Sequence, residues 1–293
     1  MNPKKNNLMT IGMLILMIGI LYQNSINNSF TNWDDIGLII NNKLIRSLSL
    51  ENIKETLIPK KASTYQPIRL LSYAVDYNFW KLNPMGYRIT NIIFYILTCI
   101  MVFFTLKILS KQFREKTEET SHFRVAIFGS LLFAAHPVHV EAVTWLAARK
   151  EVLQGFFFFS GFFLYLKARD EKSKKRFIYL FLVLFSILLA ILSKPSAVVF
   201  PGVILVYEIA RKKEGIISFI KTHWVFFLIS VIISGIFTAI LIKVMIDSGG
   251  IKPFYGKTFL ENCLVVLYAF LRSIKLLTFT VNYSAAYSFS VPL

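Results

Sequence analysis

The sequence is poor in cysteine and in acidic residues. Its two cysteines, Cys99 and Cys263, both lie in apolar runs, which argues against a disulfide framework and against a cysteine-based metal site. The 16 Asp and Glu residues are outnumbered by 33 Lys and Arg residues, giving a formal net charge of +17. The chain also has no internal repeat, no low-complexity tract and no linker rich in Gly, Pro or Ser. Residues 1–293 are therefore predicted to form a single domain.

Long apolar runs are what the sequence has instead. Hydrophobic residues make up 55% of the chain and its mean hydropathy is +0.58, above the usual range of soluble proteins. The runs approach the length of about 20 residues that a helix needs to cross a bilayer. They predict an all-α polytopic membrane protein with about seven to eight transmembrane helices. The runs lie at 8–22, 88–108, 124–143, 153–168, 177–193, 197–210, 224–246 and 263–281.

Positive charge predicts the orientation of the chain. The first run follows Lys4 and Lys5 and has no small-residue cleavage pattern after it, so we expect an uncleaved signal anchor. The two lysines, with spacers dense in Lys and Arg, place the amino terminus in the cytoplasm. Charge concentrated in loops is typical of topology signals and lipid contacts, and no nucleic acid partner is expected. These basic spacers are 109–124, 169–176 and 211–222.

The remaining connections then share the non-cytoplasmic face. They comprise a first external loop at 23–86, the turns HPVHVEAV and SKPSA, and the stretch 247–262. Every chemically suggestive cluster of the sequence falls on this face. Polar residues of a transporter would lie at mid-membrane depth on several helices, so a transporter is disfavoured.

Asp34 and Asp35 form a carboxylate pair in the first external loop, within NSFTNWDDIG. One interpretation is that they are solvated loop acids that cap a short helix beginning at DDIGLIINN. The other is that one of them is a general base, placed where Trp33 and lipid lower the local dielectric constant. Two neighbouring carboxylates push their pKa values apart, which favours such a base.

Two further residues of this loop, Tyr65 and Arg69, flank Pro67, which is expected to fix a turn or a helix start. The guanidinium of Arg69 can hold a phosphate through two hydrogen bonds. The aromatic residues that follow are typical of a belt at the membrane interface.

The segment HPVHVEAVTWLAARKEV carries His136, His139 and Glu141 at a proline turn and Arg149, Lys150 and Glu151 at the start of the next run. A zinc site is disfavoured, because Pro137 interrupts the regular helix that such histidine spacing requires. Two interpretations stay open: Glu141 and Arg149 form an ion pair at the membrane edge, or His139 or Glu141 contacts a substrate. No cofactor is predicted; a divalent cation is compatible with the chemistry, and no residue pattern supports one.

Other cations lie near the ends of apolar runs. Lys194 precedes Pro195 in a short turn, where its ammonium either snorkels to the headgroups or contacts a phosphate. Arg272 and Lys275 lie three residues apart within the last run and share one helical face. Charges there face a cavity or a partner, or else the segment lies in the interface or re-enters without crossing.

Taken together, these motifs resemble one family of membrane enzymes. In family order the chain contains WDD, YQPIRLLSYAVDYNFWKLNPMGYRITN, HPVHVEAVTWLAARKEVLQG and SKPSAVVFPGVILVYE. They look like the bacterial relatives of the transmembrane and tetratricopeptide-repeat O-mannosyltransferases. Those enzymes are similar to the protein O-mannosyltransferases of the GT-C superfamily. The resemblance therefore implies a GT-C-like bundle whose first external loop carries short interfacial helices. The resemblance covers nearly the whole chain, from about residue 8 to the closing NYSAAYSFSVPL.

The resemblance implies a glycosyltransferase that uses a polyprenyl-phosphate sugar, a hexose such as mannose, on the non-cytoplasmic, periplasmic face of a bacterial inner membrane. The acceptor would be a Ser or Thr hydroxyl of a protein or peptide. Asp34 falls on the acid taken as the base in this family, and Asp35 stands beside it. Substrate-binding motifs of the family fall on Tyr65, His136, His139 and Glu141.

The reaction needs a base for the acceptor proton and positive charge for the departing phosphate. A lipid phosphate lies at headgroup depth, where the cations of these motifs are expected. Displacement by a single nucleophile predicts inversion at the sugar. The cations expected to bind the donor phosphate or lipid are Arg69, Arg149, Lys150, Lys194, Arg272 and Lys275.

The chain departs from the family pattern in two respects. Arg88 stands where the family often has a histidine, four residues after its Asn-Pro dipeptide, either as a phosphate contact or through drift. Family members continue into further spans and a repeat domain, so residues 1–293 are expected to be a truncated membrane part. The alternative function is therefore a non-catalytic membrane component that binds a lipid phosphate or a protein partner.

Overall fold

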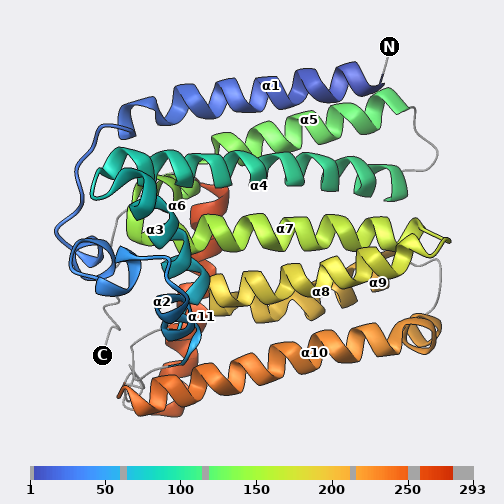
Figure 1. The fold of residues 1–293 in the computed structure, drawn as a ribbon. Helices are drawn as coiled ribbons and strands as arrows, with labels where there is room; N and C mark the ends of the chain where they lie inside the picture. The colour runs from blue at the N-terminus through green and yellow to red at the C-terminus, as the bar shows by residue number, and fades with distance from the viewer. Residues whose placement is uncertain (1–2, 60–64, 114–118, 212–215, 250–257, 280–293) are drawn as a thin grey trace.

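The computed structural model describes residues 3–59, 65–113, 119–211, 216–249 and 258–279. The described residues form helices joined by turns, with no strand among them. Their long helices run along a common direction, with α1 at one edge of the bundle and α10 at the other (Figure 1). The all-α fold expected from the apolar runs is confirmed. The long helices are α1 (Pro3–Tyr22), α4 (Pro84–Phe113), α5 (Glu119–Ala135), α7 (Arg149–Asp170), α8 (Lys175–Ser193), α9 (Phe200–Arg211) and α10 (Ile216–Asp247).

Four segments are long and apolar enough to cross a membrane, which supports an integral membrane protein. A fifth span arises if α5 and the segment Pro137–Thr144, bent by 50° from it, cross together. The runs at 153–168 and 197–210 correspond to α7 and α9. Charged residues lie in the first and last turns of α7, and α9 has only 12 residues. The predicted number of seven to eight spans therefore stays a prediction. The four segments are Lys5–Ser25, Pro84–Phe113, Lys175–Ser193 and Trp224–Asp247.

The last apolar run forms α11 (Phe259–Thr278), which begins with a capping box between Thr258 and Glu261. In Figure 1 it runs across the direction of the long helices rather than along it. It is not among the segments that qualify as spans. Of the two alternatives for this run, a segment that lies across the bundle fits the structure better than a regular span.

Two apolar cores hold the bundle together. One joins α1, α4, α5 and the start of α7, around Leu14, Tyr95 and Phe103. The other joins α7, α8, α9 and α10, around Tyr165, Ile187 and Phe200. Because α7 contributes to both cores, its ends have fixed positions relative to all the other long helices. Residues at its first turn are correspondingly well placed to form a rigid site.

Short helices gather at one end of the bundle (Figure 1). They include α2 (Leu50–Leu57), α3 (Pro67–Trp80) and α6 (Val140–Thr144). Proline at the first helical position starts α3, because its ring fixes a helical φ angle and needs no hydrogen-bond partner. The turn between α3 and α4 is tight: a Cβ on Gly86 would lie 2.0 Å from Cγ of Trp80. Only glycine fits there, which seats α3 directly on α4.

The first external loop has a small core of its own. Ile39 and Ile45 from the loop pack with Tyr73 of α3, Tyr87 of α4 and Leu146. These five side chains are fully buried, so apolar burial fixes the loop onto the bundle end. Asp34 and Asp35 lie on this anchored part of the loop.

Candidate active site

Asp34 and Asp35 differ sharply in their surroundings, although they are adjacent. Asp35 is fully buried. Its Oδ2 accepts hydrogen bonds from the backbone N and the Oγ1 of Thr31, both at 2.9 Å, and its Oδ1 accepts one from the backbone N of Ala147 at 2.9 Å. Asp34 is exposed, and within the described residues its carboxylate makes no hydrogen bond or ion pair. Asp35 therefore holds the loop in place and leaves Asp34 available.

The helix-cap interpretation of this pair does not hold. A short helix begins directly after it, at Ile36–Ile40, but the side chain of Asp35 makes no capping hydrogen bond. Its acceptor oxygens point instead to Thr31 and to Ala147, which lies 112 residues further along the chain.

Arg88 fixes the start of the same loop. Its guanidinium donates hydrogen bonds to the carbonyl of Ser29 at 2.8 Å, to that of Thr144 at 3.3 Å and to that of Asn28. With 2% exposure, it clamps backbone carbonyls and is no candidate for a phosphate contact. Trp145 adds a hydrogen bond from Nε1 to Oγ1 of Thr31 at 3.1 Å.

Arg69 of α3 is within electrostatic reach of Asp34. It is 5% exposed, and its Nη1 donates to the carbonyl of Ala147 at 3.4 Å. Its buried Nε has no hydrogen-bond partner among the described residues. Burial lowers the pKa of Arg69, and the charges of Asp34 and Glu151 oppose this shift. The guanidinium thus keeps one unused donor, and the charges of Asp34 and Glu151 favour its protonated form.

Lys150 and Lys194 complete a group of three cations. The Nζ of Lys194 lies 2.5 Å from Oε2 of Glu151, and both side chains are about one-third exposed. Burial and the cations Arg69 and Lys194 lower the pKa of Lys150, while Glu151 and Asp34 oppose the shift. These five residues, which we call the charged cluster, come from the first loop, α3, the start of α7 and the end of α8. They are Asp34, Arg69, Lys150, Glu151 and Lys194.

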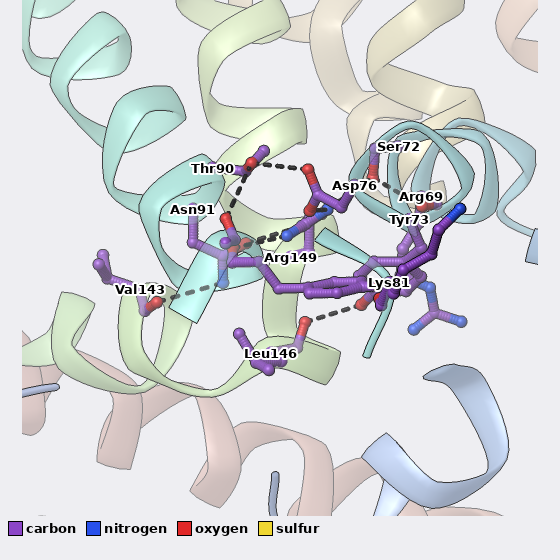
Figure 2. A network of polar contacts seen from close by, with 12 residues as sticks. Arg69, Ser72, Tyr73, Asp76, Lys81, Thr90, Asn91, Val143, Leu146 and Arg149 are labelled. Atoms are coloured by element: carbon purple, nitrogen blue, oxygen red, sulfur yellow. Dashed lines mark hydrogen bonds and ion pairs between the residues drawn. The ribbon is translucent and has the colours of Figure 1, made fainter. Parts of the chain in front are cut away.

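Arg149 lies elsewhere than expected. It is fully buried and forms an ion pair with Asp76 of α3, not with Glu141. Its Nε donates to Oδ1 of Asn91 at 2.8 Å (Figure 2). Its Nη2 donates to the carbonyl of Tyr87 at 2.6 Å. The expectation that it binds a donor phosphate is corrected here, because protein groups surround the guanidinium.

Sequence reasoning missed Asp76, the partner that makes this burial tolerable. Its Oδ1 accepts a hydrogen bond from Oγ1 of Thr90 at 2.7 Å, as Figure 2 shows. The available signal was its position: a lone carboxylate two helical turns after Arg69, within an aromatic-rich helix. Such a residue on the inner face of a helix predicts a buried cationic partner.

The two histidines face different cavities on either side of Pro137. His139 and Glu141 line a cavity of about 440 Å³ between α4, α6 and α7, which we call the aromatic cavity. Glu151 lines it too, so this cavity borders the charged cluster. Its aromatic walls are Tyr95, Phe133 and Phe159.

His136 lines a second cavity of about 390 Å³, against the end of α1. Its Nδ1 accepts a hydrogen bond from the backbone N of Val138 at 3.2 Å, and its Nε2 lies 3.1 Å from the carbonyl of Leu277 in α11. The two rings lie 6.0 Å apart between centroids, yet each lines a different cavity. Among the described residues, no group of three or more His, Cys, Asp or Glu side chains is placed to hold a metal ion.

The remaining expected site residues are Tyr65 in the first external loop and Arg272 and Lys275 on α11. The hydroxyl of Tyr65 donates to the carbonyl of Leu57 at 2.6 Å, and burial raises the pKa of this tyrosine. Arg272 is half-buried and Lys275 is exposed on α11. Neither is among the charges that act most strongly on Arg69 or Lys150.

Curated relatives of this chain share one described activity. Over 211 residues the chain is 27% identical to Protein O-mannosyl-transferase TMTC3 of Homo sapiens, covering 69% of this chain and 22% of the relative. It is 28% identical over 230 residues to Protein O-mannosyl-transferase Tmtc3 of Drosophila melanogaster, covering 71% and 25%. A third relative is Protein O-mannosyl-transferase F38B6.6 of Caenorhabditis elegans, 27% identical over 177 residues, covering 55% and 23%.

The chain thus spans about a fifth to a quarter of the length of these relatives. No family model matches the chain, and no solved structure matches it. The names of the relatives confirm the predicted resemblance to the transmembrane and tetratricopeptide-repeat O-mannosyltransferases.

Proposed function

We propose that this protein is a membrane glycosyltransferase that transfers a sugar, mannose in the first instance, from a polyprenyl-phosphate donor to a hydroxyl of an acceptor protein. The described activity of the relatives supports the reaction class. The observation that carries the proposal is the charged cluster, which combines the exposed carboxylate of Asp34, without a partner among the described residues, with the cations Arg69, Lys150 and Lys194.

Asp34 is the general base in this proposal. A base must reach the proton of the acceptor hydroxyl, and the exposed Asp34 meets this requirement. The oxygens of Asp35 are occupied by Thr31 and Ala147, so Asp35 is a positioning residue. In this proposal Asp35 positions the loop and Asp34 accepts the proton.

Arg69, Lys150 and Lys194 stabilise the donor phosphate. In the reaction, the acceptor oxygen attacks the anomeric carbon, a new carbon–oxygen bond forms, and the bond from that carbon to the phosphate oxygen breaks. The acceptor proton passes to Asp34, and the polyprenyl phosphate leaves with the bonding electron pair. Cations fixed beside the developing negative charge lower the barrier. Attack opposite to the leaving group inverts the sugar.

The site lies at the non-cytoplasmic face in this proposal. The ends of α1 and α8 and the starts of α4 and α7 meet at the same end of the bundle (Figure 1). The basic spacers 109–124 and 169–176 connect the opposite ends of these helices, which supports a cytoplasmic location for those ends. Arg272 and Lys275 remain candidate lipid contacts, because α11 presents many exposed apolar side chains together with these charges.

The direct test is Asp34→Asn beside Asp35→Asn, assayed for transfer from polyprenyl-phosphate mannose to a serine- and threonine-containing peptide. We expect Asp34→Asn to lower turnover by roughly 10²–10⁴-fold while donor binding is retained. Full activity of Asp34→Asn would contradict the assignment of the base. Wild-type protein that binds the donor and never transfers the sugar would favour the alternative, a non-catalytic lipid-phosphate-binding component.

A further inference from the structure

The aromatic cavity has polar groups that the protein does not use. Within the described part of the chain, neither the carboxylate of Glu141 nor the ring nitrogens of His139 make a hydrogen bond or an ion pair. The His139 ring packs instead against Phe133, at 4.4 Å between ring centroids, and against Tyr95, at 5.5 Å. These contacts fix the ring at the wall of the cavity.

The composition of this cavity discriminates between ligand classes. A phosphate inside the cavity would meet the carboxylate of Glu141, which is exposed and has no cation partner among the described residues, and like charges repel. A hydrocarbon chain would desolvate Glu141 and the His139 ring without giving them partners, which is costly, whereas Glu151 keeps Lys194 as its partner. A neutral ligand rich in hydroxyls avoids both penalties, because its hydroxyls donate to carboxylate and imidazole acceptors.

The aromatic walls fit the same ligand class. A sugar ring has an apolar face of carbon–hydrogen bonds, and the rings of Tyr95, Phe133 and Phe159 offer flat apolar surfaces to it. Ligand sites of this kind are mainly apolar and carry a few polar groups that set orientation. The volume of about 440 Å³ also lies within the usual range of such sites.

Glu151 joins this cavity to the charged cluster. It lines the aromatic cavity and at the same time lies 2.5 Å from Nζ of Lys194. A phosphate held by Lys194 would therefore lie beside the polar rim of the cavity. In a polyprenyl-phosphate sugar, the sugar is bonded directly to that phosphate.

We propose that the aromatic cavity binds the sugar ring of the donor, with Glu141 and His139 accepting hydrogen bonds from its hydroxyls. This inference rests on the proposed function and names the subsite that recognises the sugar. Specificity for one hexose over another then depends on residues 139 and 141. The cations of the charged cluster contact only the phosphate and do not contribute to this specificity.

The test compares two lipids of equal chain length, polyprenyl-phosphate mannose and the sugar-free polyprenyl phosphate, by titration into the detergent-solubilised full chain. The variants are Glu141→Ala and His139→Phe, the second of which keeps the aromatic packing and removes the ring nitrogens. We expect wild-type protein to bind the sugar-bearing lipid about tenfold more tightly. Each variant should lose most of this difference and bind the sugar-free lipid as wild type does.

A cavity-filling variant separates the sugar from the lipid chain. A Cβ on Gly155 would lie 3.4 Å from Thr98, so the helix tolerates Gly155→Ala, which serves as the control. Gly155→Leu projects a larger side chain into the cavity and should weaken binding of the sugar-bearing lipid alone. Equal weakening for both lipids would overturn the inference, because the cavity would then hold the chain.

Two further outcomes separate this inference from the proposed function. If wild-type protein binds both lipids equally and no variant changes this, the sugar subsite is wrong while the phosphate site stands. If wild-type protein binds neither lipid, the proposed function falls and the inference falls with it.

Discussion

Arg149 and Asp76 form an ion pair that is closed off from solvent, and it links the start of α7 to α3. The pair sits one residue away from Lys150 and two helical turns away from Arg69. The position of both cations therefore depends on it. The guanidinium also lies over the ring of Tyr73, at 4.7 Å from its centroid.

Breaking this pair should destabilise the protein strongly. Asp76→Asn removes the negative charge and leaves Arg149 buried without compensation, a change that costs about 3–5 kcal/mol. Thermal unfolding in detergent, followed by tryptophan fluorescence, measures the effect. The matched control is Asp170→Asn, which removes the partner of Arg211 at 3.2 Å in a more exposed pair and should cost about 0–1 kcal/mol. Equal losses of unfolding free energy in the two variants would contradict the prediction that the buried pair matters more for stability than the exposed pair.

Substitution of the buried Asp35 should lower the free energy of unfolding more than substitution of the exposed Asp34. Asp35→Ala removes the acceptor for Thr31 and for the buried backbone N of Ala147, and leaving such groups unpaired costs about 1–3 kcal/mol. Asp34→Ala removes a carboxylate without partners among the described residues, so unfolding should shift by less than about 0.5 kcal/mol. A larger loss for Asp34→Ala would place it in the structural role that we give to Asp35.

The long helices were largely predictable from the sequence, because an apolar run in lipid satisfies all its backbone hydrogen bonds internally only as a helix. Runs 88–108, 177–193 and 224–246 lie within α4, α8 and α10. The run 263–281 was ambiguous because Arg272 and Lys275 interrupt it, and α11 does not follow the direction of the bundle (Figure 1).

The candidate site was predictable only in part: Asp34, Lys150 and Lys194 of the charged cluster were expected, whereas Arg149 was expected with them and lies elsewhere. Arg149 and Lys150 are adjacent, and consecutive residues on a helix point about 100° apart, so one faces the interior and the other the charged cluster. Which of them is buried depends on Asp76, 73 residues earlier in the chain. Likewise, Asp35 is buried because of Ala147. Pairings across such sequence separations leave no local pattern.

Lys150 and Lys194 should contribute to donor affinity rather than to stability. Lys150→Gln and Lys194→Gln each remove one cation from the charged cluster, and a charge-assisted hydrogen bond is worth about 1.5–3 kcal/mol. Titration with polyprenyl phosphate should therefore show about ten- to a hundredfold weaker binding. Lys172→Gln, an exposed cation in the opposite basic spacer, is the matched control and should leave affinity unchanged. Similar losses in all three variants would indicate a general charge effect instead of a site.

The lowered pKa of Lys150 predicts a pH limit for donor binding. Burial and the cations Arg69 and Lys194 favour the neutral amine, so Lys150 loses its proton at a lower pH than an ordinary lysine with a pKa of about 10.4. Its attraction for phosphate is present below that shifted pKa and is lost as the pH rises through it. Donor affinity measured from pH 7 upward should fall on the alkaline side. Lys150→Arg should remove this fall, because arginine stays protonated. A fall that persists in Lys150→Arg would contradict the assignment of this titration to Lys150.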